Sequence, residues 1–173
     1  MVANLHNSSA IKPPDFNDFW EETVASTEQT PLNPTLTYLP IRSSSEVEVF
    51  DVRYFSFGGL EIAGWYARPK VVGEKFPALL QVPGYVGEPA SPSAIASQGY
   101  AVFSVAPRGK LRSNSVFNPG YPGLLTHNID DRDSYGYRGF YMDALRALDL
   151  LVSFPEVDQE RVGVMGSSQG GAL

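Results

Sequence analysis

The sequence predicts an α/β fold built on a mostly parallel sheet. Three short apolar runs, at 78–82, 100–105 and 162–165, have the nearly continuous hydrophobicity of strands that helices cover on both faces. Two segments of helical character, 93–98 and 139–154, lie between these runs. Alternating strands and helices are typical of right-handed crossovers between parallel strands, so we expect helices on both faces of the sheet.

The first 46 residues are expected to form a helix and an extended linker. Within 15–26, apolar side chains recur at the spacing of an amphipathic helix, at Phe16, Phe19, Trp20 and Val24. Three prolines interrupt 30–40, which favours an extended linker there. We therefore separate an N-terminal segment, 1–46, from a domain that begins at 47 and runs to 173.

The domain is expected to begin with an antiparallel hairpin. Residues 47–57 are rich in Val, Phe and Tyr and end at the pair Gly58-Gly59, after which 60–67 resume the strand character. In the longest predicted helix, 139–154, one apolar stripe consists of Tyr141, Leu145, Leu148 and Val152. Residues 110–137 show no period, and a loop of this length is expected to be functional, on the substrate side or at an interface.

Composition excludes several classes of function. The formal net charge of −6 opposes binding to nucleic acid or to an anionic membrane face. The chain has no cysteine, so it forms neither a disulfide framework nor a thiolate site. It shows no secretory signal, and no apolar run approaches the roughly 18 residues of a membrane span. We expect a soluble, cytoplasmic protein whose small substrate is neutral or cationic.

The run Gly166-Ser167-Ser168-Gln169-Gly170 fits GxSxG, the strand-turn-helix elbow that presents a nucleophilic serine in α/β-hydrolases. A strand-like segment precedes it, and Gly166 and Gly170 are the small residues that a strained turn needs. The alternative is a turn that binds a phosphate or nothing. A phosphate loop would need Lys followed by Ser or Thr, and a dinucleotide site would need GxGxxG after the first strand. Neither is present, so we predict that Ser168 is the nucleophile.

A serine nucleophile also needs an oxyanion hole. In this fold one backbone N–H comes from the residue after the serine, here Gln169. The second comes from the loop after an earlier strand, where Pro83-Gly84-Tyr85 stands, and Gly84 would allow the Tyr85 N–H to point at the oxyanion. The alternative is an ordinary Pro-Gly turn. We favour the oxyanion hole because of the loop's place after the strand.

No base is evident among the other residues. Both histidines, His6 and His127, precede the serine, whereas the catalytic His of this topology comes last. His127 is therefore expected to be a loop residue. The carboxylates of Asp130, Asp131 and Asp133 project in divergent directions, so we expect a solvated turn or helix cap and no metal site.

From about Phe16 onward the chain resembles the acetyl xylan esterase and cephalosporin C deacetylase family, a carbohydrate-esterase branch of the α/β-hydrolases. The residues that carry the resemblance are 137–173, supported by NPGYPGLLTHNIDDRDSYGYRG before them and by Gly64-Trp65 and Gly84-Tyr85. The resemblance implies hydrolysis of acetyl esters on short acetylated sugars, without a cofactor, by a cytoplasmic homo-oligomer.

The resemblance also implies roles for individual residues. Ser168 matches the family nucleophile, and the amides of Tyr85 and Gln169 match its oxyanion hole. Arg108-Gly109 matches the start of the family's Arg-Gly-Gln signature, but Lys110 stands where Gln is expected and Pro107 where an acidic residue is common. This departure leaves the hydrogen bonding behind the elbow open.

In the family, the triad Asp and His lie in a second half that follows the serine. We therefore expect the N-terminal part of an α/β-hydrolase fold, truncated just after the nucleophile elbow and inactive alone. Its C-terminal half would be a separate chain or a missing segment. Two alternatives stay open: a serine peptidase of the prolyl oligopeptidase type, whose elbows also carry GxSxGG, and a non-catalytic fragment whose role is association.

Overall fold

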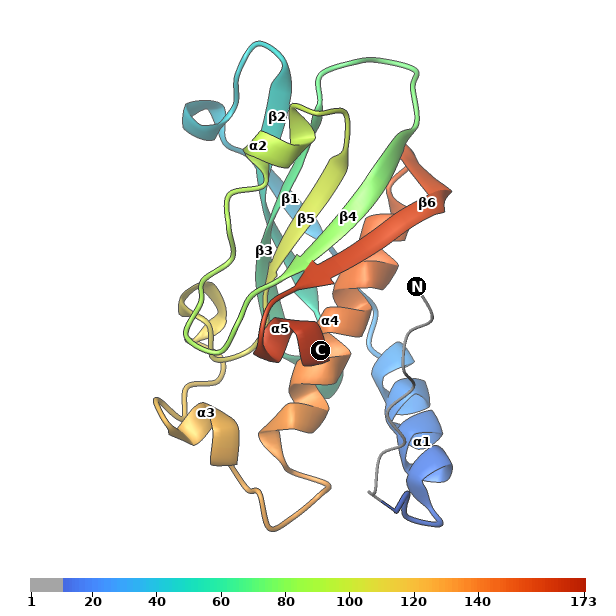
Figure 1. Cartoon of the computed structure of the whole chain (residues 1–173), viewed down its shortest axis with the longest axis vertical. Helices are drawn as coiled ribbons and strands as arrows, with labels where there is room; N and C mark the ends of the chain where they lie inside the picture. Colours follow the sequence, from blue (N-terminus) through green and yellow to red (C-terminus); the bar gives the residue numbers. More distant parts are fainter. Residues whose placement is uncertain (1–10) are drawn as a thin grey trace, which may run out of the picture.

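The structure is a computed structural model that describes residues 11–173 (Figure 1). Its strands are β1 (Thr35–Tyr38), β2 (Val47–Phe55), β3 (Glu61–Pro69), β4 (Phe76–Val82), β5 (Ala101–Ala106) and β6 (Val157–Gly166). Its helices are α1 (Phe16–Glu28), α2 (Ser93–Ala96), α3 (Gly123–Thr126), α4 (Gly136–Ser153) and α5 (Gln169–Ala172). Short 3₁₀ turns occur at Pro40–Arg42, Phe57–Gly59 and Leu111–Ser113.

The strands of the described residues form a six-stranded sheet in the order β1-β2-β3-β5-β4-β6. β2 and β3 form the predicted antiparallel hairpin, and β3 pairs antiparallel with β5. β4 pairs parallel with both β5 and β6, so the three apolar runs are the parallel part of the sheet, as predicted. This arrangement brings the carboxyl ends of β4 and β6 to one edge, where the site is built.

Helices cover both faces of the sheet (Figure 1). On one face Ala147, Leu150 and Leu151 of α4 pack into the main core, which also contains Tyr54 and Phe103. On the other face α2 contributes to a smaller cluster of buried residues, which consists of Val47, Val49, Ala67, Ala96 and Val102. Full burial of a large apolar side chain is worth about 1.5–3 kcal/mol, so these clusters account for most of the fold's stability.

The expected linker over 30–40 is only partly correct. Thr35–Tyr38 forms β1, which pairs antiparallel with β2, although all four of its side chains are exposed. Prolines are tolerated here because β1 is an edge strand and Pro34 and Pro40 lie outside it. The division of the chain at 46 stays a prediction, and the pairing of β1 with β2 crosses it.

The two long helices form where the pattern predicts them, but their buried faces differ from the apolar stripes. In α1 the fully buried residues are Thr23 and Thr27. The Thr23 hydroxyl donates to the Phe19 carbonyl at 2.7 Å and accepts from Arg138 Nε at 2.9 Å. In α4 the stripe at Tyr141, Leu145, Leu148 and Val152 is half-buried, and the neighbouring face is the one packed against the sheet.

The long segment without a period, 110–137, contains a 3₁₀ turn and the short helix α3. The Ser113 hydroxyl ties its start to the sheet, because it donates to the Ala106 carbonyl at 2.6 Å and accepts from the Ala63 N–H at 2.9 Å. The functional role of this loop stays a prediction. Within the described residues, no helix is long and apolar enough to cross a membrane.

Candidate active site

The nucleophile elbow lies between β6 and α5. Ser168 is exposed and has φ 55° and ψ −121°, a backbone conformation that an L residue rarely adopts. Such strain costs on the order of 1–3 kcal/mol and persists only where the surroundings enforce it. The turn is held because the N–H of Gly170 donates to the Ser167 carbonyl at 3.0 Å and that of Gly171 to the Ser168 carbonyl at 2.9 Å.

Two glycines permit the close approach of backbones at this turn. A Cβ on Gly166 would lie 2.1 Å from the Gly170 carbonyl oxygen. A Cβ on Gly170 would lie 2.2 Å from the Val82 oxygen and 2.8 Å from that of Pro83. Both distances are far below any real contact, so only glycine fits at either position.

The loop after β4 runs directly beside the serine. A Cβ on Gly84 would lie 3.2 Å from the Ser167 oxygen and 3.8 Å from the Ser168 Cβ. Among the described residues, no backbone carbonyl accepts a hydrogen bond from the N–H of Tyr85 or of Gln169. The two segments that meet at the elbow thus each carry a backbone N–H without such an acceptor, and the oxyanion hole at these two positions stays a prediction.

Lys110, the departure from the family signature, is buried behind this loop with only 3% of its surface exposed. Its Nζ donates to the Gly84 carbonyl at 2.6 Å and also to the Tyr85 carbonyl. Burial lowers the pKa of the Lys110 amine, and the charge of Glu88 opposes that shift. The hydrogen bonding that the sequence left open is therefore made by an ammonium group.

Arg108 is held by a residue that sequence reasoning missed. Its Nε and Nη2 donate to the two carboxylate oxygens of Asp143, each at 2.8 Å, and Nη2 also donates to the Phe57 carbonyl at 2.8 Å. Asp143 is fully buried on α4. A Cβ on Gly139 would lie 2.4 Å from Arg108 Nη1, so this glycine makes room for the guanidinium. The sequence gives no signal specific to Asp143, because α4 also carries the charged residues Arg138, Arg146 and Asp149.

A second contact joins α4 to the elbow. The side-chain amide of Gln169 donates to the Tyr137 hydroxyl at 3.0 Å. Tyr137 stacks on Tyr135, with 5.3 Å between ring centroids. The residue after the nucleophile is therefore fixed through its side chain, while its backbone N–H has no backbone acceptor in the described chain.

The structure does not join a histidine to the serine. His6 lies outside the described residues. His127 ends α3 and packs edge-on against Phe117, with 5.0 Å between ring centroids. Within the part of the chain that the structure describes, no hydrogen bond links His127 to Ser168.

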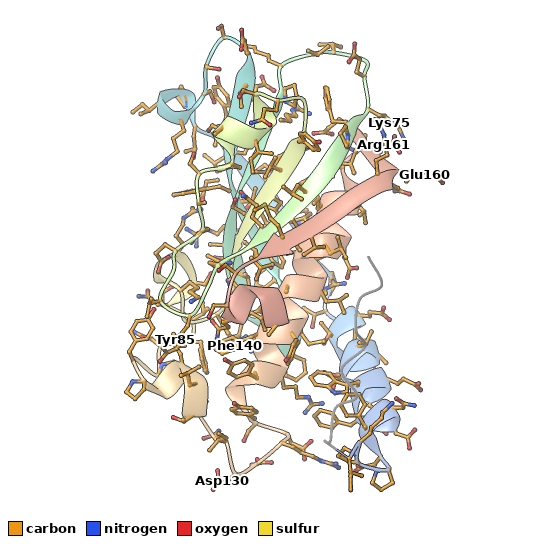
Figure 2. All side chains as sticks on the ribbon, viewed as in Figure 1. Lys75, Tyr85, Asp130, Phe140, Glu160 and Arg161 are labelled. Atoms are coloured by element: carbon orange, nitrogen blue, oxygen red, sulfur yellow. The ribbon has the colours of Figure 1, made fainter. Side chains whose placement is uncertain are left out.

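The acidic run forms a solvated turn, as expected. Asp131 accepts from the Asp133 N–H at 3.0 Å and from the Ser134 hydroxyl at 2.6 Å. The hydrogen bond from Ser134, and after it that from the Asp133 N–H, lowers the pKa of the Asp131 carboxyl. Asp130 lies at one extremity of the molecule, apart from Tyr85 (Figure 2).

A cavity of about 230 Å³ opens beside the elbow. It is lined by the end of β4 and its loop, by 88–90, and by 165–167 at the end of β6. Ser167, the residue before the predicted nucleophile, is among the residues that line it.

The chain is similar in sequence to known acetyl esterases. The family model described as acetyl xylan esterase (AXE1) matches residues 4–173. The acetyl esterase Axe7A of Xylanibacter ruminicola is 27% identical over 173 residues, an alignment that covers 93% of this chain and 39% of that protein.

Two solved structures are similar to the chain. Acetyl xylan esterase from Paenibacillus sp. R4 superimposes with a TM-score of 0.86 at 33% identity, covering 95% of this chain and 55% of that one. Acetyl xylan esterase 1 from Thermoanaerobacterium sp. JW/SL YS485 superimposes with a TM-score of 0.79 at 26% identity, covering 92% and 52%. The chain thus spans about half, or less, of these relatives. It has the α/β-hydrolase fold and belongs to the acetyl xylan esterase family.

Proposed function

We propose that the chain supplies the nucleophile and the oxyanion hole of a serine carboxylic-ester hydrolase that removes acetyl groups from short acetylated sugars. The observation that carries this proposal is the strained, exposed Ser168 between β6 and α5, with the Gly84–Tyr85 loop directly beside it. Membership of the acetyl xylan esterase family supports acetyl esters as the substrate class. We propose that the same site also hydrolyses the acetyl ester of cephalosporin C-like compounds.

The reaction follows from these groups. A base takes the Ser168 proton while Oγ attacks the acetyl carbonyl carbon. The carbonyl oxygen becomes an oxyanion, which the N–H groups of Tyr85 and Gln169 stabilise. The C–O bond to the sugar breaks and the sugar oxygen takes the proton, leaving an acetyl-enzyme. Water, activated by the same base, then releases acetate and restores the serine.

We further propose that the base and its acidic partner come from polypeptide beyond these 173 residues. His127 makes no hydrogen bond to Ser168 within the described chain, and the relatives are about twice as long or longer. β6 is also an edge of the sheet, where Val164 and Met165 are 57% and 46% exposed. A C-terminal half that pairs with β6 would cover these side chains.

A fluorophosphonate probe tests the assignment of Ser168, since labelling requires an activated hydroxyl. Intact-mass and peptide mass spectrometry should find one adduct on Ser168 in the enzyme completed by its C-terminal half, and much slower labelling of the 173-residue chain. Ser168→Ala should abolish the adduct, and Ser167→Ala is the matched control. A completed enzyme that takes no label, or an adduct that persists in Ser168→Ala, would contradict the proposal.

Substrate comparison tests the reaction class. Release of acetate from acetylated xylo-oligosaccharides, with no amine release from model peptides, is expected. Amine release would favour the prolyl oligopeptidase-type peptidase. A completed enzyme that releases neither would favour the non-catalytic fragment. Activity that survives a chelator would agree with an enzyme that needs no metal ion.

The family resemblance further supports a cytoplasmic enzyme that forms a homo-oligomer. Cell fractionation and light scattering of the completed enzyme test these two points. A secreted protein would contradict the first, and a monomer would contradict the second.

A further inference from the structure

The buried ammonium of Lys110 holds one particular peptide group. The Gly84 carbonyl and the Tyr85 N–H belong to the same peptide plane, and in a trans peptide they point in opposite directions. Lys110 Nζ binds the carbonyl side at 2.6 Å and also binds the next carbonyl, that of Tyr85. Fixing the carbonyl therefore fixes the direction of the N–H on the other side of the plane.

The rest of the loop depends on the same carbonyl. The Gly84 oxygen also accepts from the Gly87 N–H at 3.1 Å, which closes a turn over 84–87. A cationic donor on a carbonyl also polarises the peptide group and strengthens its N–H as a donor. Lys110 thus acts on both the orientation and the donor strength of the Tyr85 N–H.

The position of Lys110 is itself rigid. Its N–H donates to the Pro107 carbonyl at 3.0 Å, and its own carbonyl accepts from the Ser113 N–H at 2.7 Å. Gly109, with φ 79°, makes the turn before it. The neighbouring Arg108 is anchored by its ion pair with Asp143.

We propose that Lys110 is a positioning residue for the oxyanion hole, which acts by holding the Gly84–Tyr85 peptide with its N–H toward Ser168. The proposal rests on the proposed function of Ser168. It predicts that the group at 110 controls the rate of the chemical step rather than the binding of the ester, because the N–H is needed most strongly when the oxyanion forms.

Three substitutions and one control test it. Lys110→Met keeps the length of the side chain and removes the donor. Lys110→Gln introduces the family residue with a neutral amide donor, and Lys110→Arg keeps a cationic donor. Lys75→Met is the control, because Lys75 is an exposed lysine far from Tyr85 (Figure 2). Esterase kcat and KM are measured on the completed enzyme, and hydrogen exchange of the 84–87 amides on the same samples.

Lys110→Met is expected to lower kcat by about 10- to 100-fold with KM within about twofold of wild type, less than the loss of a whole oxyanion donor. Exchange at Gly87 should be at least about tenfold faster, since its acceptor is no longer held. Lys110→Gln and Lys110→Arg should restore part of the wild-type kcat and part of the slow exchange at Gly87. Lys75→Met should change neither kcat nor exchange. Recovery by these variants distinguishes positioning from a general loss of folding.

Wild-type kcat and wild-type exchange in Lys110→Met would overturn the proposal. So would a rise in KM with kcat unchanged, or a Lys110→Met protein that fails to fold while Gln and Arg recover nothing. The exchange measurement needs no activity. If the wild-type enzyme hydrolyses no ester but the 84–87 amides still exchange faster in Lys110→Met, Lys110 fixes the loop and the proposed function is contradicted instead.

Discussion

Arg108 and Asp143 form a bidentate ion pair that is almost completely withdrawn from solvent, with 8% of the Arg108 side chain and none of the Asp143 side chain exposed. Asp143 also accepts from the Arg108 backbone N–H at 2.8 Å. The pair ties the segment after β5 to α4, two residues before Lys110, whose Nζ donates to the Gly84 and Tyr85 carbonyls. Removal of one partner leaves the other as a buried charge without a counter-charge. This destabilises the fold much more than the intact pair stabilises it.

Asp143→Asn is therefore expected to lower the free energy of unfolding by about 3–5 kcal/mol, because the Arg108 guanidinium loses its counter-charge. Urea denaturation measures the change. Asp158→Asn is the matched control, since Asp158 pairs with a 56% exposed Arg161 and exposed pairs contribute about 0–1 kcal/mol. Equal losses of unfolding free energy in the two variants would show that the buried pair contributes no more to stability than the exposed one.

The type of the strands that position the site is largely predictable from the sequence, whereas their order in the sheet was not predicted. The apolar runs at 78–82, 100–105 and 162–165 identify the parallel part, although of these three strands only β5 is buried on both faces. β1 was not predicted because the prolines of 30–40 favoured a linker, and the polar–apolar alternation of Thr35–Tyr38 spans only four residues. Its pairing with β2 confirms it as a strand.

The contacts behind the elbow could not be predicted for a different reason. Lys110 reaches a carbonyl 26 positions earlier, and Arg108 reaches a carboxylate 35 positions later. Such partners are set by the packing of the loop after β5 against β4 and α4. A motif marks Ser168, but no local pattern in the sequence indicates which group fixes the peptide opposite it.

The two adjacent glycines of the elbow are expected to respond differently to alanine. Gly170→Ala would place a Cβ 2.2 Å from the Val82 oxygen, whereas in Gly171→Ala the nearest atom is 3.4 Å away. We expect Gly170→Ala to lose about 1–3 kcal/mol of stability, as for other overpacked sites, and to lose fluorophosphonate labelling.

Gly171→Ala should keep wild-type labelling and stability, because its Cβ makes an ordinary contact. Thermal unfolding and the labelling rate of the completed enzyme are the measurements. If both variants label at the wild-type rate, the elbow is not held by the close approach of Gly170 to the end of β4.

Because of Tyr66, the stability of the chain is expected to depend on pH in the alkaline range. Its hydroxyl donates to Glu156 at 2.8 Å, and burial, reinforced by the Glu156 charge, raises the pKa of the Tyr66 phenol well above its usual 10.0. Above pH 10 the unfolded phenol loses its proton while the folded one keeps it. The unfolded state then binds fewer protons, so the free energy of unfolding falls as pH rises.

Tyr66→Phe should remove this contribution and make the decline above pH 10 shallower by about 1.4 kcal/mol per pH unit. Tyr54→Phe should act in the same direction, because burial also raises the pKa of the fully buried Tyr54 phenol. Denaturant unfolding at several values between pH 8 and 11 gives the slopes. Slopes identical to wild type in both variants would contradict the prediction.

The exposed edge of β6 should control self-association of the 173-residue chain. Its first part is protected by charge, because Glu160 and Arg161 project from the far end of the strand (Figure 2). Its second part carries Val164, which is 57% exposed on a strand with unpaired backbone groups along one side. An apolar edge of this kind pairs readily with another chain, and a lysine on it prevents such pairing.

Val164→Lys is expected to lower the apparent mass of the chain in light scattering at high concentration, with little change in the unfolding midpoint, because Val164 is already 57% exposed. Val72→Lys is the matched control, since Val72 is 99% exposed in the loop before β4. Equal effects of the two variants would mean that net charge, and not the edge, governs association. An effect confined to Val164→Lys would locate the contact at β6, and the same variant should then weaken assembly with the C-terminal half, because both would use the same strand edge.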